Sequence, residues 1–172
     1  MPLTNIPVGP NPPFAVNVFI EIAHGSKPIK YELDKSSGVL IVDRFIKTPM
    51  FYPGNYGFIP NTLSDDGDPC DVMFVGCPPV IPGVIVRGQP IGVLLMEDEN
   101  GFDEKIICVP LDTMENIHDV MQLSEETRNL IQHFFMHYKD LDEGKWVKIM
   151  GWGNAADAHR LINEGIARAD NK

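Results

Sequence analysis

Cysteine, cationic side chains and long apolar runs are all scarce in this sequence, and each shortage excludes a class of protein. The three cysteines, Cys70, Cys77 and Cys108, cannot all pair with one another and show no Cys-x-x-Cys spacing, so neither a disulfide scaffold nor a structural zinc site is expected. Lysine and arginine number 14 against 24 acidic residues, and the net charge of −10 opposes unaided binding to the phosphates of nucleic acid or anionic lipid. No apolar run approaches the roughly 20 residues that span a bilayer. We therefore expect a cytoplasmic protein with no nucleic-acid and no membrane partner.

Proline is missing from the last third of the chain. All 15 prolines lie at or before Pro110, and proline is tolerated in turns and at strand edges but not inside helices. Residues 14–110 are therefore predicted to form strands and turns, while residues 111–172 are free to be helical. The length of 172 residues suits one domain, and no internal repeat or boundary is visible. The prediction is a single domain over residues 1–172.

Short apolar stretches separated by proline- and glycine-rich turns fill the first part of the chain. Alternation, as at Val16, Val18 and Ile20, is typical of a strand with one buried face. The predicted strands cover residues 16–22, 29–33, 39–45, 72–75, 84–87, 91–96 and 105–109. Many short strands at this spacing predict a closed or nearly closed β-barrel. Two helices should follow, with Ser124 and Asn154 as their N-caps.

The densest chemical signal is the acidic run Asp65-Asp66-Gly67-Asp68-Pro69-Cys70-Asp71. Four carboxylates within seven residues repel one another unless cations lie among them. A solvated acidic turn is one interpretation, but Pro69 stiffens the run and a buried strand follows it, which fixes the directions of the carboxylates. A calcium loop of the EF-hand type fails on spacing, because Asp71 and Cys77 stand where that loop needs its glycine and its last glutamate. The run is therefore predicted to bind cations.

A second acidic cluster surrounds Asn100-Gly101. An Asn-Gly pair between two strand-like runs predicts a hairpin with a two-residue turn, in which Asp98 lies opposite Asp103. Directly opposed residues have Cβ atoms about 5 Å apart, so two aspartates at this place indicate a cation between them. Lys105 is expected on the same face as Asp103. The alternative is that the hairpin simply directs its acids into water.

Cationic and phenolic side chains form a third group. They lie on two neighbouring predicted strands, in the aromatic segment 51–60, which is expected to be a loop, and at the end of the first predicted helix. A phenol hydroxyl in a polar cleft is a useful hydrogen-bond donor. At the helix end, a lysine that complements the helix C-terminus is the simpler interpretation. The group comprises Lys30, Arg44, Tyr52, Tyr56, Tyr138 and Lys139.

Together the three groups indicate a densely anionic substrate that is held by Lys, Arg and Tyr and bridged to carboxylates by Mg²⁺. These are the components of phosphoryl transfer to water with metal-ion catalysis. No Walker loop, Gly-x-Ser-x-Gly elbow or His-Glu-x-x-His motif is present. Two alternatives remain open. A non-enzymatic divalent-cation-binding module would give Lys30, Arg44 and Lys139 no role, and an oligonucleotide-binding barrel conflicts with the charge of −10.

Several of these segments recur together in one known family. The motif at residues 66–72, Asp-Gly-Asp-Pro-Cys-Asp-Val, is the most specific of them. The others, in order and at consistent spacing, lie at residues 29–32, 42–45, 52–57, 97–99, 103–105 and 133–141. From about residue 16 to its C-terminus the sequence thus resembles the soluble family I inorganic pyrophosphatases. Cys70 departs from the family's usual aliphatic residue, but a cysteine is small and apolar enough to fill that place.

This resemblance implies a fold, a reaction and a role for each residue. The fold is an OB-type β-barrel with flanking helices, mainly β within the α+β class. The reaction is Mg²⁺-dependent hydrolysis of inorganic pyrophosphate, bound as its magnesium complex, to two phosphates by a metal-activated water. Asp68 is the implied general base. The implied metal ligands are Asp66, Asp71, Asp98, Asp103 and Glu32; the pyrophosphate ligands are Lys30, Arg44, Tyr56, Lys105, Tyr138 and Lys139; and Glu21 and Tyr52 support them.

The resemblance also implies an assembly. The short chain and a helix that carries two histidines are similar to the bacterial, hexameric branch of the family. His133 and His137 are four residues apart and therefore share one face of that helix. The expectation is a homo-oligomer, a hexamer, with both histidines near a subunit interface.

Overall fold

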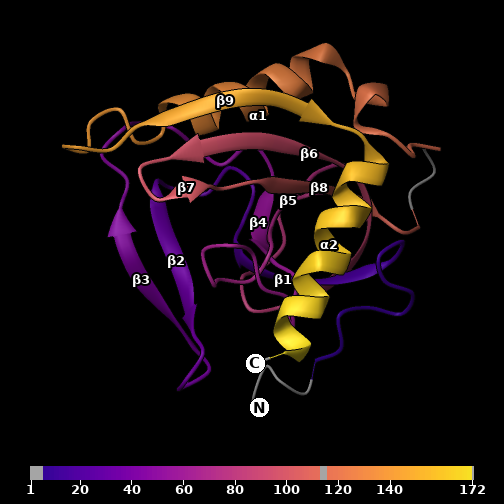
Figure 1. The fold of residues 1–172 in the computed structure, drawn as a ribbon. Helices are drawn as coiled ribbons and strands as arrows, with labels where there is room; N and C mark the ends of the chain where they lie inside the picture. Colours follow the sequence, from indigo (N-terminus) through magenta and orange to yellow (C-terminus); the bar gives the residue numbers. More distant parts are fainter. Residues whose placement is uncertain (1–5, 113–115, 172) are drawn as a thin grey trace.

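The computed structural model describes residues 6–112 and 116–171 of the chain (Figure 1). Its strands are β1 (Val16–Ile22), β2 (Ile29–Asp34), β3 (Val39–Phe45), β4 (Asn55–Phe58), β5 (Asp71–Phe74), β6 (Ile85–Asp98), β7 (Gly101–Phe102), β8 (Lys105–Pro110) and β9 (Val147–Gly153). Its helices are α1 (Glu125–His137), α2 (Ala155–Asp170) and a short 3₁₀ helix at Val120–Gln122. In these two ranges no helix has the length and apolar character needed to cross a membrane.

Five of the strands close into a barrel. They pair in the order β1-β4-β5-β8-β6, and β6 returns to pair with β1. Strands β5 and β8 run parallel, and the other pairs in the barrel are antiparallel. A five-stranded Greek-key barrel of this kind is the OB architecture. The predicted fold is confirmed.

Strand β6 is what closes the barrel, and it differs from the prediction. Two strands were expected at residues 84–87 and 91–96, but the structure has one strand of 14 residues that runs through Pro90. Proline has no N–H to donate, and the pairing with β8 shifts its register between Pro90 and Gly92, which accommodates this loss. Residues 85–88 of β6 pair with β1, residues 88–94 pair with β8, and residues 93–98 pair with β9.

Two strands lie where none was expected. Strand β4 falls in the aromatic segment 51–60, and its Gly57 lies so close to β1 that an added Cβ would stand 1.8 Å from the carbonyl oxygen of Phe19. Strand β9 falls in the region 111–172 that was expected to be helical, and it pairs with β6. The absence of proline permits a strand as well as a helix. Along β9, half-buried Val147 and Ile149 alternate with exposed Lys148 and Met150, a period of two that the sequence already carries.

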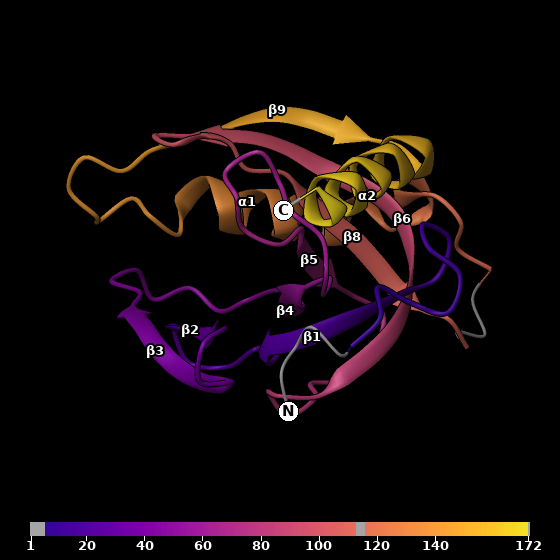
Figure 2. The same cartoon turned by 60° about the horizontal axis from the view of Figure 1, so that its bottom comes forward.

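The two helices begin at the predicted caps and pack on opposite apolar layers. The side chains of Ser124 and Asn154 accept hydrogen bonds from the first turns of α1 and α2. Helix α1 buries aromatic and aliphatic side chains against one cluster that includes Tyr56 and Met73, and α2 packs against a second cluster that includes Phe74. Figure 2 shows both helices on the side of β6 and β8, away from β1. Every residue of β1 is nevertheless buried, because its side chains contribute to both clusters and, at Phe19, to a third cluster with Leu33 and Phe58.

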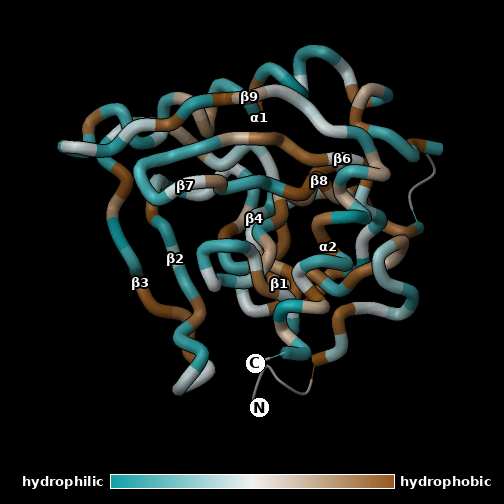
Figure 3. The backbone as a smooth tube through the Cα atoms, in the orientation of Figure 1, coloured by the Kyte–Doolittle hydropathy of each residue, from teal (hydrophilic) through white to brown (hydrophobic). Residues whose placement is uncertain are grey.

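Strands β2 and β3 form a separate two-stranded hairpin beside the barrel. Lys30 on β2 lies directly opposite Arg44 on β3. Strand β3 was predicted as an apolar strand, yet Ile41 and Phe45 are exposed, and Figure 3 shows hydrophobic segments on this outer strand. The hairpin brings two cationic side chains, Lys30 and Arg44, to one end of the barrel.

Candidate functional site

A polar cleft of about 210 Å³ opens at the end of the barrel next to the β2–β3 hairpin. It collects residues from strands, loops and the end of α1 that are far apart in the sequence. Of the predicted site residues it is lined by Glu21, Lys30, Glu32, Arg44, Tyr56, Asp66, Asp68, Asp71, Asp98, Asp103, Lys105, Tyr138 and Lys139. Tyr52 is not part of the lining. It is buried behind the cleft, with its ring centroid 5.2 Å from that of Tyr56 and 4.5 Å from that of Phe134.

The acidic run forms a tight loop between β4 and β5. The Asp66 carboxylate accepts a hydrogen bond from the backbone N–H of Asp68 at 2.9 Å, and the Ser64 N–H donates to the Asp68 carbonyl at 2.7 Å. Gly67 has a φ of +88°, a conformation that favours glycine at this turn. Burial raises the pKa of Asp66, while the hydrogen bond from Asp68 opposes that rise. The Asp68 side chain is 69% exposed and ion-pairs with Lys35 at 2.9 Å.

Lys105 lies at the bottom of the cleft between two carboxylates. Its Nζ donates to Asp71 Oδ2 at 2.6 Å and to Asp103 Oδ1, and it lies 5.9 Å and 5.8 Å from the ring centroids of Tyr56 and Phe135. Burial is the largest single influence on Lys105 and would lower its pKa, but the negative charges of Asp71 and Asp103, together with the neighbouring phenols, outweigh it and raise the pKa well above its usual value. Lys105 therefore remains a cation, on the same side as Asp103 as predicted.

The hairpin at β7 has a different register from the predicted one. Asp98 lies opposite Gly101, and the Asp103 N–H bonds to the carbonyl of Met96, so Asp98 and Asp103 do not face each other. The turn falls one residue earlier than expected because the Asp98 carboxylate accepts from the N–H of Asn100 at 2.8 Å. Gly101, with a φ of +115°, stands in the strand.

Asp98 has a lysine partner of its own. Its Oδ2 accepts from Lys139 Nζ at 2.6 Å, and both side chains are less than a tenth exposed. Desolvation is the largest single influence and favours the neutral form of Asp98, but the hydrogen bonds from Lys139 and Asn100 and the charge of Lys139 together outweigh it and lower the pKa of Asp98. The pair therefore carries both charges, with Lys139 drawn into the cleft rather than complementing the end of α1.

Three charged residues of the cleft were missed by the sequence analysis. Lys35 reaches Asp68 from the β2–β3 turn, and Lys145 pairs with Glu99 from the segment between α1 and β9. Lys35 and Lys145 are isolated charged residues next to turns, so nothing in the sequence separated them from other surface residues, whereas Glu99 lies in the second acidic cluster but was given no role of its own. On the hairpin side of the cleft, Lys30 ion-pairs with Asp43 at 3.0 Å, and its Nζ lies 3.7 Å from Glu32.

Glu21 is a buried carboxyl at the back of the cleft. It is 6% exposed, and its Oε1 accepts a hydrogen bond from the N–H of Leu33 at 2.7 Å, which joins β1 to β2. Desolvation raises the pKa of Glu21 to about 8, although the hydrogen bond from Leu33 acts against it. At neutral pH this carboxyl is largely protonated in the metal-free protein.

Replacing Glu21 with glutamine should stabilise the metal-free protein at alkaline pH. The folded pKa of about 8 lies above the ordinary value of 4.5, so the wild type loses stability as the pH rises from about 4.5 through 8. Glutamine keeps the acceptor for Leu33 and cannot ionise. In excess chelator, E21Q is expected to melt a few degrees above wild type at pH 8, with the difference closing toward pH 4.5. Equal melting temperatures at pH 8, measured by thermal denaturation, would contradict the desolvation argument.

The donor set of the cleft fits a hard divalent cation in its chemistry. Its anionic groups are all carboxylates, which Mg²⁺ and Ca²⁺ prefer, and it holds no cysteine or histidine. Within residues 6–112 and 116–171, however, no three acidic, histidine or cysteine side chains are arranged as a ready-made metal site. Lys105 and Lys139 explain this, because they occupy oxygens of Asp71, Asp103 and Asp98. A bound cation has to share these carboxylates with the two lysines.

His133 and His137 lie outside the cleft, on α1. Their ring centroids are 4.7 Å apart, and Nδ1 of His137 lies 2.7 Å from Oδ2 of Asp140. Leu130, one turn earlier, is 57% exposed.

Comparisons with known proteins agree on one family. A family model described as inorganic pyrophosphatase matches residues 18–170. The chain is 54% identical over 176 residues to an inorganic pyrophosphatase of Bradyrhizobium diazoefficiens, with 100% of this chain and 99% of that protein covered. It is 56% identical over 171 residues to one of Rhodospirillum rubrum, with 97% and 96% covered. Its structure is similar to the crystal structure of inorganic pyrophosphatase from Thermus thermophilus, with a TM-score of 0.94, 41% identity and 99% of both chains covered.

Proposed function

Because the chain belongs to the inorganic pyrophosphatase family, a family that uses a divalent metal cofactor, we propose that it hydrolyses inorganic pyrophosphate to two phosphates with Mg²⁺. The observation that carries the proposal is the cleft, which combines carboxylates with lysine, arginine and tyrosine side chains at one end of the barrel. Pyrophosphate carries several negative charges, so a cleft that binds it needs both fixed cations and carboxylates that recruit metal ions. Both kinds of group are present.

The proposed ligands of Mg²⁺ are Asp66, Asp71, Asp98, Asp103 and Glu32, with Glu21 behind them. Carboxylate oxygens suit a small, hard ion that keeps some of its water. When bound, such an ion neutralises phosphate charge and makes a coordinated water more acidic. Lys139 already helps to hold Asp98 in its ionised form, and Lys105 orients the carboxylate of Asp71 through a direct ion pair.

The fixed cations and phenols are proposed to bind and orient pyrophosphate. Lys30 and Arg44 lie on the hairpin side of the cleft, and Lys105 and Lys139 lie on the barrel side, so the substrate would be held between two walls. Burial raises the pKa of Tyr56, which keeps this hydroxyl a hydrogen-bond donor at neutral pH. Tyr138 contributes a second phenol, and Tyr52 supports the ring of Tyr56 from behind. Positioning and charge stabilisation of this kind account for most of the catalysis in phosphoryl transfer.

Asp68 is proposed as the general base. Its exposed carboxylate stands at the mouth of the cleft and is not held by Lys105 or Lys139, unlike those of Asp71 and Asp98. It can therefore approach an attacking water and take its proton, while the fixed cations stabilise the charge that develops on the leaving phosphate.

Phosphate release from pyrophosphate tests the function directly. Activity is expected with Mg²⁺ and should be lost in excess chelator, because unneutralised pyrophosphate cannot bind among the carboxylates of the cleft. Ca²⁺ should inhibit, since a larger ion with less strict geometry misplaces water and substrate. Full activity in excess chelator would overturn the metal-dependent mechanism, and no phosphate release under any condition would overturn the activity itself.

We also propose that the chain is one domain, acts in the cytoplasm and assembles as a hexamer with His133 and His137 near an interface. The exposed Leu130 beside them supports an interface on this face of α1. Light scattering at neutral pH and micromolar concentration should give a mass about six times that of the 19.2 kDa chain. A monomer under these conditions would refute the assembly. Replacing both histidines with alanine should shift the distribution toward smaller species.

A further inference from the structure

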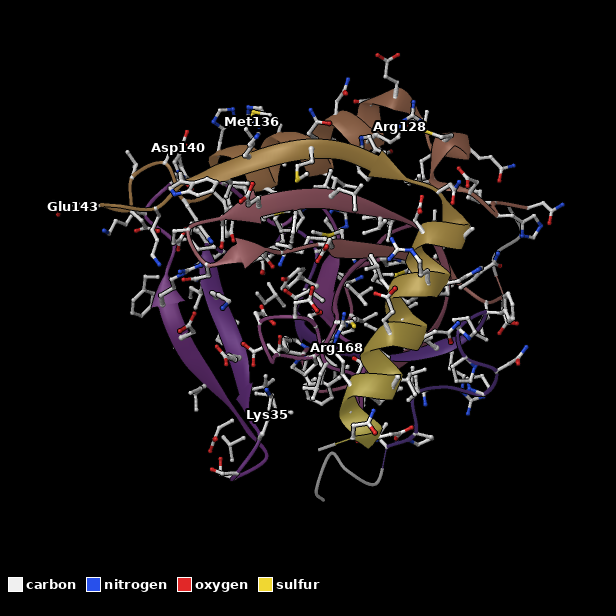
Figure 4. The ribbon with its side chains drawn as sticks, viewed as in Figure 1. Lys35, Arg128, Met136, Asp140, Glu143 and Arg168 are labelled. Carbon is white, nitrogen blue, oxygen red and sulfur yellow. The ribbon has the colours of Figure 1, made fainter. Side chains whose placement is uncertain are left out.

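The C-terminal helix α2 is attached to the stem of the acidic loop by a set of polar contacts. Arg168 Nη2 ion-pairs with Asp65 Oδ1 at 2.6 Å, and its Nη1 donates to the carbonyl of Leu63 at 3.2 Å. The N–H of Leu63 in turn donates to the carbonyl of Gly165 at 2.9 Å. Figure 4 labels Arg168 at the inner side of α2, close to these loops. Arg168 therefore binds the start of the loop through its two terminal nitrogens, Nη2 to Asp65 and Nη1 to Leu63.

The helix backbone also rests on the far end of the same loop. A Cβ added at Gly165 would lie 2.7 Å from Cys70 Sγ and 3.3 Å from the carbonyl oxygen of Leu63, so only glycine allows this close approach. The N–H of Cys70 donates to Thr62 Oγ1 at 3.0 Å, which ties the two ends of the loop together. Helix α2 thus sits on the closed base of the loop that carries Asp66, Asp68 and Asp71.

Apolar packing between the loop and α2 is incomplete near Asp65. A cavity of about 20 Å³, lined by Asp65, Cys70, Glu104 and Arg168 among others, lies between the loop and α2. Cys70 packs among apolar side chains at the far end of the loop, but at this small hollow near Asp65 the loop is joined to α2 by polar contacts. Arg168 supplies two of them, and nothing in the proposed chemistry otherwise uses Arg168 or Asp65.

We propose that Arg168 is a positioning residue for the divalent metal, which it serves by fixing the acidic loop through Asp65 and Leu63. This inference rests on the proposed function, because it concerns the ions that Asp66 and Asp71 would hold. Partners that orient metal ligands from behind commonly change metal affinity by 10- to 100-fold when they are removed. Arg168 acts one residue away from the ligands, so an effect of about 10-fold is expected.

The sign of the effect separates positioning from simple electrostatics. Removing a cation close to a cluster of carboxylates should by itself make the cluster attract Mg²⁺ more strongly. Loss of positioning should have the opposite effect. The Asp65–Arg168 pair is also largely exposed, with side chains 65% and 36% exposed, and surface ion pairs contribute little to stability. A weaker metal affinity with an unchanged melting temperature can therefore come only from positioning.

The matched variants are R168Q and R160Q. Arg160 lies on the same helix and pairs with Glu164 at 3.0 Å, a carboxylate that also lies 3.6 Å from Arg168 Nη2, so R160Q removes the same charge and shares a helix partner with Arg168 but has no contact to the loop. Mg²⁺ binding is measured by titration calorimetry without substrate, and the Mg²⁺ dependence of activity is measured separately. R168Q should bind Mg²⁺ about 10-fold more weakly and recover most of its kcat at saturating Mg²⁺. R160Q should bind as wild type does, and both should melt within about 2 °C of it.

A double-mutant cycle tests whether Asp65 is the link. If Arg168 acts mainly through Asp65, R168Q should weaken Mg²⁺ binding far less in the D65N background than in wild type, because only its contact with the Leu63 carbonyl is then left to lose. If the losses of Mg²⁺ affinity in D65N and R168Q simply multiply in the double variant, Arg168 does not act through Asp65. R168Q with the affinity of R160Q would overturn the positioning role while leaving the proposed function intact. If wild type itself binds no Mg²⁺ and releases no phosphate, the proposed function has failed instead.

Discussion

Asp68→Asn should lose roughly 10²- to 10⁴-fold in kcat while its affinities for Mg²⁺ and pyrophosphate change little. Asparagine keeps the size of the side chain and an acceptor oxygen, but it cannot take a proton. The loop should also keep its shape, because Asp68 contributes to it through its backbone N–H and carbonyl rather than its carboxylate. The loss should therefore fall on the chemical step alone.

Asp71→Asn is the matched comparison, because it makes the same change in the same loop. The carboxylate of Asp71 accepts from Lys105 at 2.6 Å, and its charge is proposed to hold metal. Its replacement should weaken Mg²⁺ binding and activity together. Steady-state kinetics over a range of Mg²⁺ concentrations distinguishes the two variants. If D68N needs far more Mg²⁺ and then regains full kcat, Asp68 is a ligand and another residue is the base.

Lys105→Met should destabilise the metal-free protein by about 3–5 kcal/mol, the range seen when one partner of a buried ion pair is removed. Lys105 is 2% exposed, and methionine can fill much of its volume beside Tyr56 and Phe135. Methionine leaves Asp71 and Asp103 without their shared cation, however. Added Mg²⁺ should restore part of the lost stability, since it can neutralise the same carboxylates. Activity should fall as well, because a proposed phosphate ligand is gone.

Lys145→Met provides the control for that experiment. Lys145 also pairs with an acid of the cleft, Glu99, but its side chain is 37% exposed. Its loss should cost no more than about 1 kcal/mol. Denaturant unfolding of both variants, with chelator and then with Mg²⁺, measures the difference. K105M that is as stable as K145M in chelator would show that the buried ion cluster does not contribute as described.

The sequence predicted most of the cleft because its chemistry is concentrated in short local motifs. The loop at residues 65–71 and the strand after it were identified together, and the stiff loop does place its acids at the cleft. The strand pattern was sufficient for a barrel, since proline and glycine divide the chain into apolar segments of strand length. The sequence analysis did not predict strand β4, because its four residues with a central glycine carry no clear alternation of apolar and polar side chains.

Contacts between residues far apart in the chain could not be predicted from the sequence. The local preference of Asn100-Gly101 predicted a turn at those two residues, but Asp98 is held by Lys139, 41 residues away, and bonds to Asn100 at the turn. The hydrogen bond from Asn100 to Asp98 and the distant contact with Lys139 together override the Asn-Gly preference and move the register. Arg168 is a similar case. Its partners in the loop, Leu63 and Asp65, lie about a hundred residues earlier, and the sequence around Arg168 gives no sign of them.

Strand β6 has a consequence for how this protein is made. It is synthesised well before β9, so the edge that β9 later covers, from Val93 to Asp98, leaves the ribosome with its backbone groups unpaired. Exposed strand edges recruit other chains, and partly folded barrels are prone to aggregate. Lys139, which neutralises Asp98 at the end of β6, also arrives late. Until β9 emerges, the nascent chain therefore holds a barrel with one edge of β6 uncovered and an incomplete cleft, and truncation before β9 should produce insoluble protein rather than a smaller working enzyme.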